Sequence, residues 1–99
     1  MTELLDAKDQ ASSLLQLQHM NPDWHTDQNG LKNAWLFKNF EQAVEFMNRV
    51  ATVVQAMDHH PEWFNVYNRV DVTLTTHDCN GLSERDIQLA QFMEQAASL

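Results

Sequence analysis

Hydrophobic residues recur at steps of three and four along three segments of the chain, a spacing that predicts helices. These segments are 3–18, 40–57 and 83–97. We expect Thr2 to cap the first segment. Ser83 and Asp86 form a variant of the capping box at the start of the third, where Leu82 and Ile87 are placed to pack as a hydrophobic staple.

Four short segments between the predicted helices indicate β-strands, and the last of them has a clear period of two. They are 24–26, 31–38, 63–67 and 70–76. In the last segment Val70, Val72 and Leu74 alternate with polar residues, so one strand face should pack against the helices. Asn29-Gly30 is typical of a hairpin turn because both residues tolerate positive φ, and we expect a second turn near Asn68-Arg69.

The order of elements is therefore α-β-β-α-β-β-α. Two antiparallel hairpins covered by helices predict an α+β two-layer sandwich, in which a four-stranded antiparallel sheet carries three helices on one face. The length of 99 residues fits a single domain spanning 1–99.

The segment 40–57 is more apolar than one sheet-facing stripe requires, because Phe46 and Val53 add a second apolar edge. Two interpretations are open: a deeply buried helix, or a helix that packs against another subunit. Small domains bury a modest share of their surface, and association would bury more. We therefore expect a homodimer or homotetramer.

The charge balance limits the classes of partner. Lys and Arg number 6 against 14 Asp and Glu, which gives a net charge of −8, and the basic residues form no run. Because nucleic-acid binding depends on basic residues that neutralise phosphates, we expect no direct contact with nucleic acid.

The longest apolar runs are far shorter than the roughly 20 residues of a membrane helix, so we expect no membrane insertion. Cys79 is the single cysteine, which suits a reducing cytoplasm.

Histidine is the residue type that points to chemistry. His59 and His60 precede Pro61, which should end the long helix. His77 follows the strand whose hairpin partner begins just after Pro61. Because a hairpin returns its far end to its start, we expect the three imidazoles to converge, with Trp63 at the edge of the site. Imidazoles titrate near neutral pH and serve as general acids and bases.

Other interpretations of these residues stay open. The histidines could be ordinary surface or capping residues. Three histidines could hold a catalytic zinc ion, although adjacent residues seldom bind one ion together and no His-x-x-x-His spacing occurs. Cys79 could pair with a histidine as a nucleophile, or could be a half-buried thiol in the loop before Gly81.

Three runs resemble the pterin-4a-carbinolamine dehydratase family: DHHPEWFNVYNRV at 58–70, VTLTTH at 72–77 and GLSERD at 81–86. The similarity extends from about residue 24 to the end of the chain. It implies the same order of elements and the dehydration of 4a-hydroxytetrahydropterin to quinonoid dihydropterin. That step recycles tetrahydropterin after an aromatic amino acid hydroxylase, to which the chain would be functionally linked. No metal or other cofactor is expected.

The resemblance also implies roles for particular residues. His59, His60 and His77 match the family's active-site histidines, and Asp86 matches its closing acid. We expect His59 and His77 to act as the acid/base pair and His60 to bind and orient the substrate. The residues expected to contact the pterin are Trp63, Thr75, Thr76 and Asp86, with the two threonines acting through backbone groups. Asp86 could instead serve only as part of the helix cap.

One position departs from the family pattern. A charged residue is usual four positions before the first motif histidine, and this chain has Gln55 there. Since a carboxylate would orient an imidazole and raise its pKa, we expect an active enzyme with a lower histidine pKa, which a pH–rate profile of the native protein and of Gln55→Glu would show.

A second function is also implied. Animal members of the family act as dimerisation cofactors for a homeodomain transcription factor, through the helix that packs subunits together. The wide apolar arc of 40–57 could serve such a protein contact or simple self-association.

Overall fold

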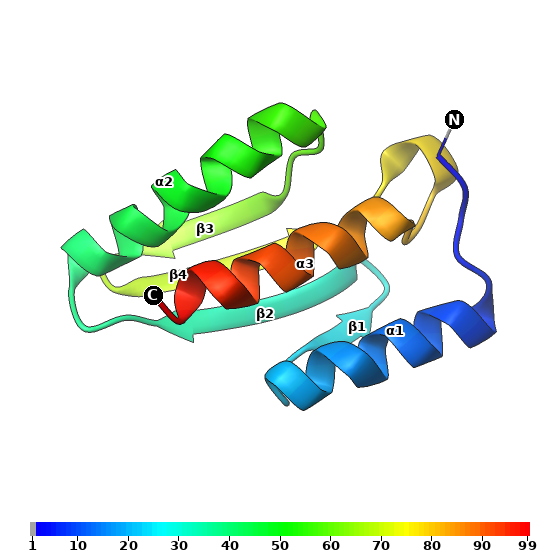
Figure 1. The fold of residues 1–99 in the computed structure, drawn as a ribbon, viewed down its shortest axis with the longest axis horizontal. Coiled ribbons are helices and arrows are strands. Elements are labelled where there is room, and N and C mark those ends of the chain that lie inside the picture. The colour runs from blue at the N-terminus through cyan, green and yellow to red at the C-terminus, as the bar shows by residue number, and fades with distance from the viewer. Residues whose placement is uncertain (1) are drawn as a thin grey trace.

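The computed structural model describes residues 2–99, which form three helices and four strands (Figure 1). In chain order they are α1 (Ala7–Met20), β1 (His25–Asp27), β2 (Gly30–Leu36), α2 (Phe40–Met57), β3 (Glu62–Val66), β4 (Arg69–Leu74), a short 3-10 turn η1 (His77–Cys79) and α3 (Glu84–Ala97). No helix in this part of the chain combines the length and hydrophobicity that a membrane crossing requires.

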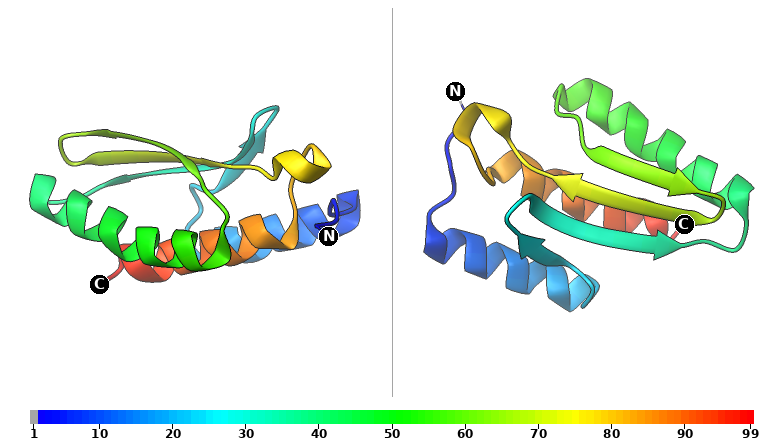
Figure 2. Two further views of the ribbon diagram at one scale, coloured as in Figure 1. Left: turned by 90° about the horizontal axis from the view of Figure 1, so that it is seen from above. Right: turned by 180° about the vertical axis from the view of Figure 1, so that it is seen from behind.

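The strands form one antiparallel sheet in the order β1-β2-β4-β3. Seen from the side, the three helices lie in one layer and the sheet in the other (Figure 2). The predicted α+β two-layer sandwich is therefore confirmed, and the second face of the sheet is left without helices.

The core lies between the two layers. Val70, Val72 and Leu74 of β4 are buried, as the alternation predicts. Trp24 and Phe46 are fully buried and belong to an aromatic cluster with Trp35 and Phe37, whose neighbouring ring centroids lie 5.0–5.6 Å apart. Aromatic contacts of this kind add to the stabilisation that burial alone provides.

The second apolar edge of α2 is largely explained within the chain. Phe46 is fully buried, and Val53 is partly buried against the core. Burial within the chain therefore accounts for Phe46 and Val53 without a contact to another subunit. On α2 itself, Phe40 is the large apolar side chain left exposed, at 48%.

The first helix begins later than the pattern suggests. Asp6 is the N-cap, and its Oδ1 accepts a hydrogen bond from the Asp9 N–H at 2.8 Å. Before it, the Leu5 N–H donates to the Leu82 carbonyl at 2.8 Å, which holds the segment in extended form beside the start of α3. The prediction that Thr2 caps this helix was therefore wrong, because a tertiary backbone bond takes over those residues.

The hairpin between β1 and β2 also differs in detail from the prediction. Gln28 and Asn29 form the turn, and Gly30 is already paired with Asp27. Gly30 has a φ of 139°, whereas Asn29 is not among the residues with positive φ. A Cβ on Gly30 would lie 2.2 Å from the Leu74 carbonyl oxygen, so this glycine permits the close approach of β2 and the end of β4.

We expect Gly30→Ala to lower the free energy of unfolding by at least about 2 kcal/mol, because it adds both backbone strain and a clash with a main-chain oxygen. Urea denaturation followed by circular dichroism measures the change. Gly81→Ala is the matched control, since its new Cβ meets only the flexible end of the Leu4 side chain. Equal losses in the two variants would contradict this explanation.

Candidate active site

One cavity of about 230 Å³ brings the three predicted histidines together, between the end of α2 and the connection from β4 to α3. Its lining residues are Asp58, His59, His60, Thr75, Thr76, His77, Asp78 and Arg85. The three histidines therefore line one cavity as predicted, although β4 ends at Leu74 and His77 begins η1.

The end of α2 turns the two adjacent histidines in different directions. Asp58 adopts the left-handed conformation with φ 51°, and its N–H donates to the carbonyls of Gln55 and Val54. This ends the helix, so His59 turns inward and is only 7% exposed. His60 is exposed at the mouth of the same cavity.

The buried histidine is held by a buried carboxylate. Asp86, in the first turn of α3, is fully buried, and its Oδ1 lies 2.6 Å from Nε2 of His59. An isolated carboxylate in such a position would be costly, but charge-assisted hydrogen bonds compensate for its loss of water. The predicted acid at this position thus contacts a histidine directly and belongs to the α3 capping box as well.

Two hydroxyl residues complete the carboxylate's surroundings. The Thr76 hydroxyl donates to Asp86 Oδ2 at 2.7 Å, and the Ser83 N–H donates to the same oxygen at 3.0 Å. The Thr76 and Ser83 hydroxyls lie 2.7 Å apart. Because the single Thr76 hydroxyl proton is directed to Asp86, the Ser83 hydroxyl must donate to Thr76.

This arrangement determines how the His59 ring presents its nitrogens. An ionised carboxylate can only accept hydrogen bonds, so Nε2 of His59 carries a proton. In neutral His59, Nδ1 is then the nitrogen with a free lone pair. Among residues 2–99 no hydrogen-bond partner of Nδ1 is found, and it is not a fully buried atom. The pair therefore offers one oriented imidazole nitrogen for proton transfer.

Charged side chains surround the histidines. Asp58 and Asp78 line the cavity together with Arg85, a cation that the sequence argument did not single out. Arg85 precedes the acid of the GLSERD run, in the first turn of α3. Its position beside Asp86 gave no clue to this, because neighbouring residues on a helix point in different directions.

The remaining predicted contact residues have different surroundings. Thr75 lines the cavity, whereas Trp63 does not: it lies opposite Val72 on the helix-facing side of β3 and is 36% exposed. The Thr76 N–H donates to the Gly81 carbonyl, and the Thr76 carbonyl accepts from Cys79 and Gly81. These main-chain groups are thus engaged by the loop itself.

Gln55 and Cys79 both lie away from the role that each was considered for. Gln55 is exposed and does not line the histidine cavity, whereas the carboxylate that orients a histidine comes from Asp86 on α3. The Cys79 thiol points at main-chain carbonyls, 3.6 Å from Thr76 O and 3.7 Å from Gly81 O. Within residues 2–99, no three His, Cys, Asp or Glu side chains are grouped in a way that could hold a metal ion.

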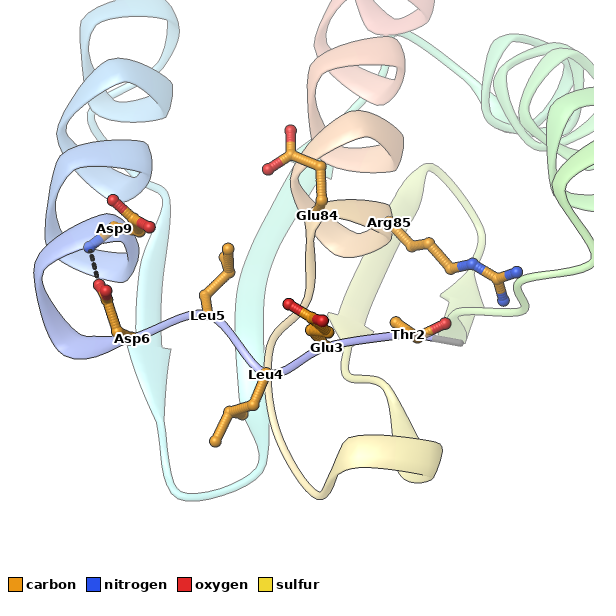
Figure 3. A pocket seen from close by; sticks show the side chains of 8 residues that line it. All are labelled: Thr2, Glu3, Leu4, Leu5, Asp6, Asp9, Glu84 and Arg85. Atoms are coloured by element: carbon orange, nitrogen blue, oxygen red, sulfur yellow. Dashed lines mark hydrogen bonds between the residues drawn. The ribbon is translucent and has the colours of Figure 1, made fainter.

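A larger depression lies elsewhere, between the N-terminal segment and the start of α3 (Figure 3). It measures about 570 Å³, and most of its charged lining residues are carboxylates: Glu3, Asp6, Asp9 and Glu84. The volume of a cavity therefore does not identify the candidate site in this chain, because the three histidines line a smaller cavity. Arg85 borders both spaces.

Comparison with known proteins identifies the family of the chain. The family model for pterin 4 alpha carbinolamine dehydratase matches residues 3–96. The chain belongs to this family. A Burkholderia vietnamiensis protein assigned as a pterin-4-alpha-carbinolamine dehydratase is 52% identical over 79 residues, which cover 78% of each chain. A Burkholderia cenocepacia protein with the same assignment is 64% identical over 62 residues, which cover 63% of this chain and 61% of that one.

A solved structure from Brucella melitensis, described as a transcriptional coactivator/pterin dehydratase, superposes with a TM-score of 0.87. It is 39% identical in sequence, and the match covers 94% of this chain and 97% of that one. This similarity extends the family assignment to the arrangement of the whole domain.

We expect Thr76→Val to loosen the orientation of the His59 ring, because Asp86 Oδ2 loses its hydroxyl donor while the side-chain volume is kept. Long-range ¹H–¹⁵N spectra of the imidazoles measure this: the native ring should show the Nε2–H tautomer, and the variant a mixture. Thr76→Ser is the matched control and should restore the native spectrum. A pure Nε2–H tautomer in the valine variant would show that Thr76 has no influence on the ring.

Proposed function

We propose that the chain dehydrates 4a-hydroxytetrahydropterin to quinonoid dihydropterin by histidine acid/base catalysis. The observation that carries this proposal is the grouping of three imidazoles around one cavity, with one of them oriented by a fully buried carboxylate. Membership of the dehydratase family supports the same reaction.

The reaction needs two proton transfers. The C4a–O bond breaks, and the departing oxygen must be protonated because hydroxide is a poor leaving group. The N5 lone pair forms the new C4a=N5 double bond, and a base removes the N5 proton. One acid and one base, placed on either side of the C4a–N5 bond, therefore suffice, and the products are quinonoid dihydropterin and water.

We assign His59 and His77 as the acid/base pair and His60 as a binding residue. His59 acts through Nδ1, because Asp86 engages Nε2. His60 and His77 are exposed to an incoming substrate. Thr75 remains a substrate-contact residue, whereas Asp86 and Thr76, whose polar side-chain atoms bond to protein groups, act by positioning His59.

The biological setting follows from this reaction. The substrate forms when a pterin-dependent aromatic amino acid hydroxylase turns over, so we propose that the chain recycles tetrahydropterin for such an enzyme. A cytoplasmic location stays a prediction, based on the single cysteine.

We expect His59→Ala and His77→Ala each to reduce kcat by roughly 10²–10⁴-fold, the usual contribution of a positioned acid or base. Stopped-flow measurement of 4a-hydroxytetrahydropterin dehydration, corrected for the spontaneous reaction, gives the rates. His19→Ala, at the exposed end of α1, is the control and should keep the native rate. A double variant of His59 and His77 as fast as the native protein would refute the proposed function.

A second proposal concerns association with protein partners. The related Brucella melitensis chain is described as a coactivator as well as a dehydratase. In this chain Phe40 on α2 is exposed, and the half-buried Val44 follows one turn later on the same helix face. We propose that this face of α2 mediates self-association into a homodimer or homotetramer, or binds a protein partner.

Light scattering should then give the native protein a mass above that of one 11.5 kDa chain. Phe40→Glu with Val44→Glu should reduce that mass, because it places two carboxylates in a dry contact. Glu41→Gln, which changes a neighbouring exposed residue, is the control. A native protein that is monomeric at high concentration would contradict self-association, and His59→Ala should leave the mass unchanged.

A further inference from the structure

The segment before α1 lies against the chain that leads from η1 into α3. The Leu5 N–H donates to the Leu82 carbonyl at 2.8 Å. A Cβ on Gly81 would lie 2.6 Å from Cδ1 of Leu4, so the Leu4 side chain rests directly on that glycine. Figure 3 shows the segment crossing this chain, with Leu4 and Leu5 on opposite sides of it. We refer to residues 2–6 as the strap.

The loop 76–81 carries His77 with few buried contacts of its own. Thr76 and Gly81 close the base of the loop through two main-chain hydrogen bonds, of 2.8 and 3.3 Å. Between them, η1 has no side-chain cap hydrogen bond, and none of its residues is buried. Segments with few buried contacts open at low cost in free energy. The position of His77 therefore depends on how firmly the base of the loop is held.

The strap holds the base of this loop from outside. Gly81 lies beneath Leu4 and is bonded across the loop to Thr76. The next residue, Leu82, is 6% exposed, belongs to the core and accepts the main-chain bond from the strap. The strap thus secures the loop at the point where the chain returns to the core. The ring of His59 has a separate support, because Asp86 holds it directly.

We infer that the strap is a positioning element of the proposed active site, which keeps the loop closed so that His77 stays in the histidine cavity. This inference rests on the proposed function, because it takes His77 to transfer a proton. Leu4 is the positioning residue: it acts through Gly81 and does not line the histidine cavity. Displacement of a reacting group by about 1 Å can cost on the order of 10²-fold in rate, so a loosened loop should slow the reaction.

The charges around the strap make its apolar contact more important. The depression between the strap and α3 is lined by four carboxylates and one cation: Glu3, Asp6, Asp9, Glu84 and Arg85. Within residues 2–99 none of these five side chains forms an ion pair. Carboxylates on the two sides of the depression repel one another. The Leu4 side chain and the main-chain bond of Leu5 therefore hold the strap against this repulsion.

Leu4→Ala tests the strap, and Leu15→Ala is the matched control. The two leucines are 54% and 58% exposed, and Leu15 lies in the second half of α1. Both changes should lower the urea midpoint of unfolding by similar, small amounts. Leu4→Ala alone should reduce kcat for dehydration, by roughly 3- to 30-fold, with KM within about twofold of the native value. Leu4→Met keeps the apolar volume and should restore the native kcat.

Amide hydrogen exchange reports on the loop without requiring activity. The Gly81 N–H, which bonds to Thr76 across the base of the loop, should exchange roughly 10-fold faster in Leu4→Ala. It should keep its native rate in Leu15→Ala. The amides of β4 should keep their native rates in both variants, because the strap does not contact the sheet there.

Gly81→Ala disturbs the same contact from the other side, since its new Cβ would displace the Leu4 side chain. It should lower kcat in the native chain. In the Leu4→Ala background it should cause no further loss, because the shorter side chain leaves room for the added methyl group. Additive losses in the double variant would overturn the proposed route through Gly81.

Three other results would overturn the strap: a native kcat in Leu4→Ala, equal losses of kcat in Leu4→Ala and Leu15→Ala, or native Gly81 exchange in a Leu4→Ala variant with reduced kcat. In each case a fast native reaction would leave the proposed function standing. A native protein that does not accelerate the dehydration would overturn the positioning role and the proposed function together.

Discussion

The buried Asp86 carboxylate is the constraint on which the site depends. It lies in the first turn of α3 without contact with water, and its oxygens accept hydrogen bonds from His59, Thr76 and Ser83. These partners come from the end of α2, the segment after β4 and the N-cap of α3. One side chain thereby links three parts of the chain that are distant in sequence, and each must fold correctly for the carboxylate to be stable in the interior.

This constraint explains how a structural feature can also orient a histidine. A capping acid is favourable at a helix N-terminus because of the exposed N–H groups and the helix dipole. Here Oδ2 of the same carboxylate accepts from the helix cap, and Oδ1 contacts Nε2 of His59. The contact with Nε2 leaves Nδ1 as the free ring nitrogen. The layers of the sandwich position the ends of their elements, and the three histidines lie on the connections between those elements.

The two faces of the sheet differ in what covers them. The helix layer fills one face with the core, so the open face is free to carry polar residues such as Lys32 and Thr73. His77 follows β4 at the point where this face meets the histidine cavity. The histidine cavity and the open face of the sheet therefore adjoin at His77.

Local patterns in the sequence determined the order of elements, the alternation of β4, the limits of α2 and the capping box of α3, because each depends on neighbours within a few positions. The sequence also predicted that the histidines lie together, because a hairpin brings its far end back to its start. Only the tertiary structure decided the rest. Asp6 replaces Thr2 as the cap because Leu5 bonds to Leu82, and Trp63 turns toward the helix layer because of its pairing with Val72. The contacts of Asp86 with Thr76 and His59 span 10 and 27 positions, and no local spacing encodes such distances.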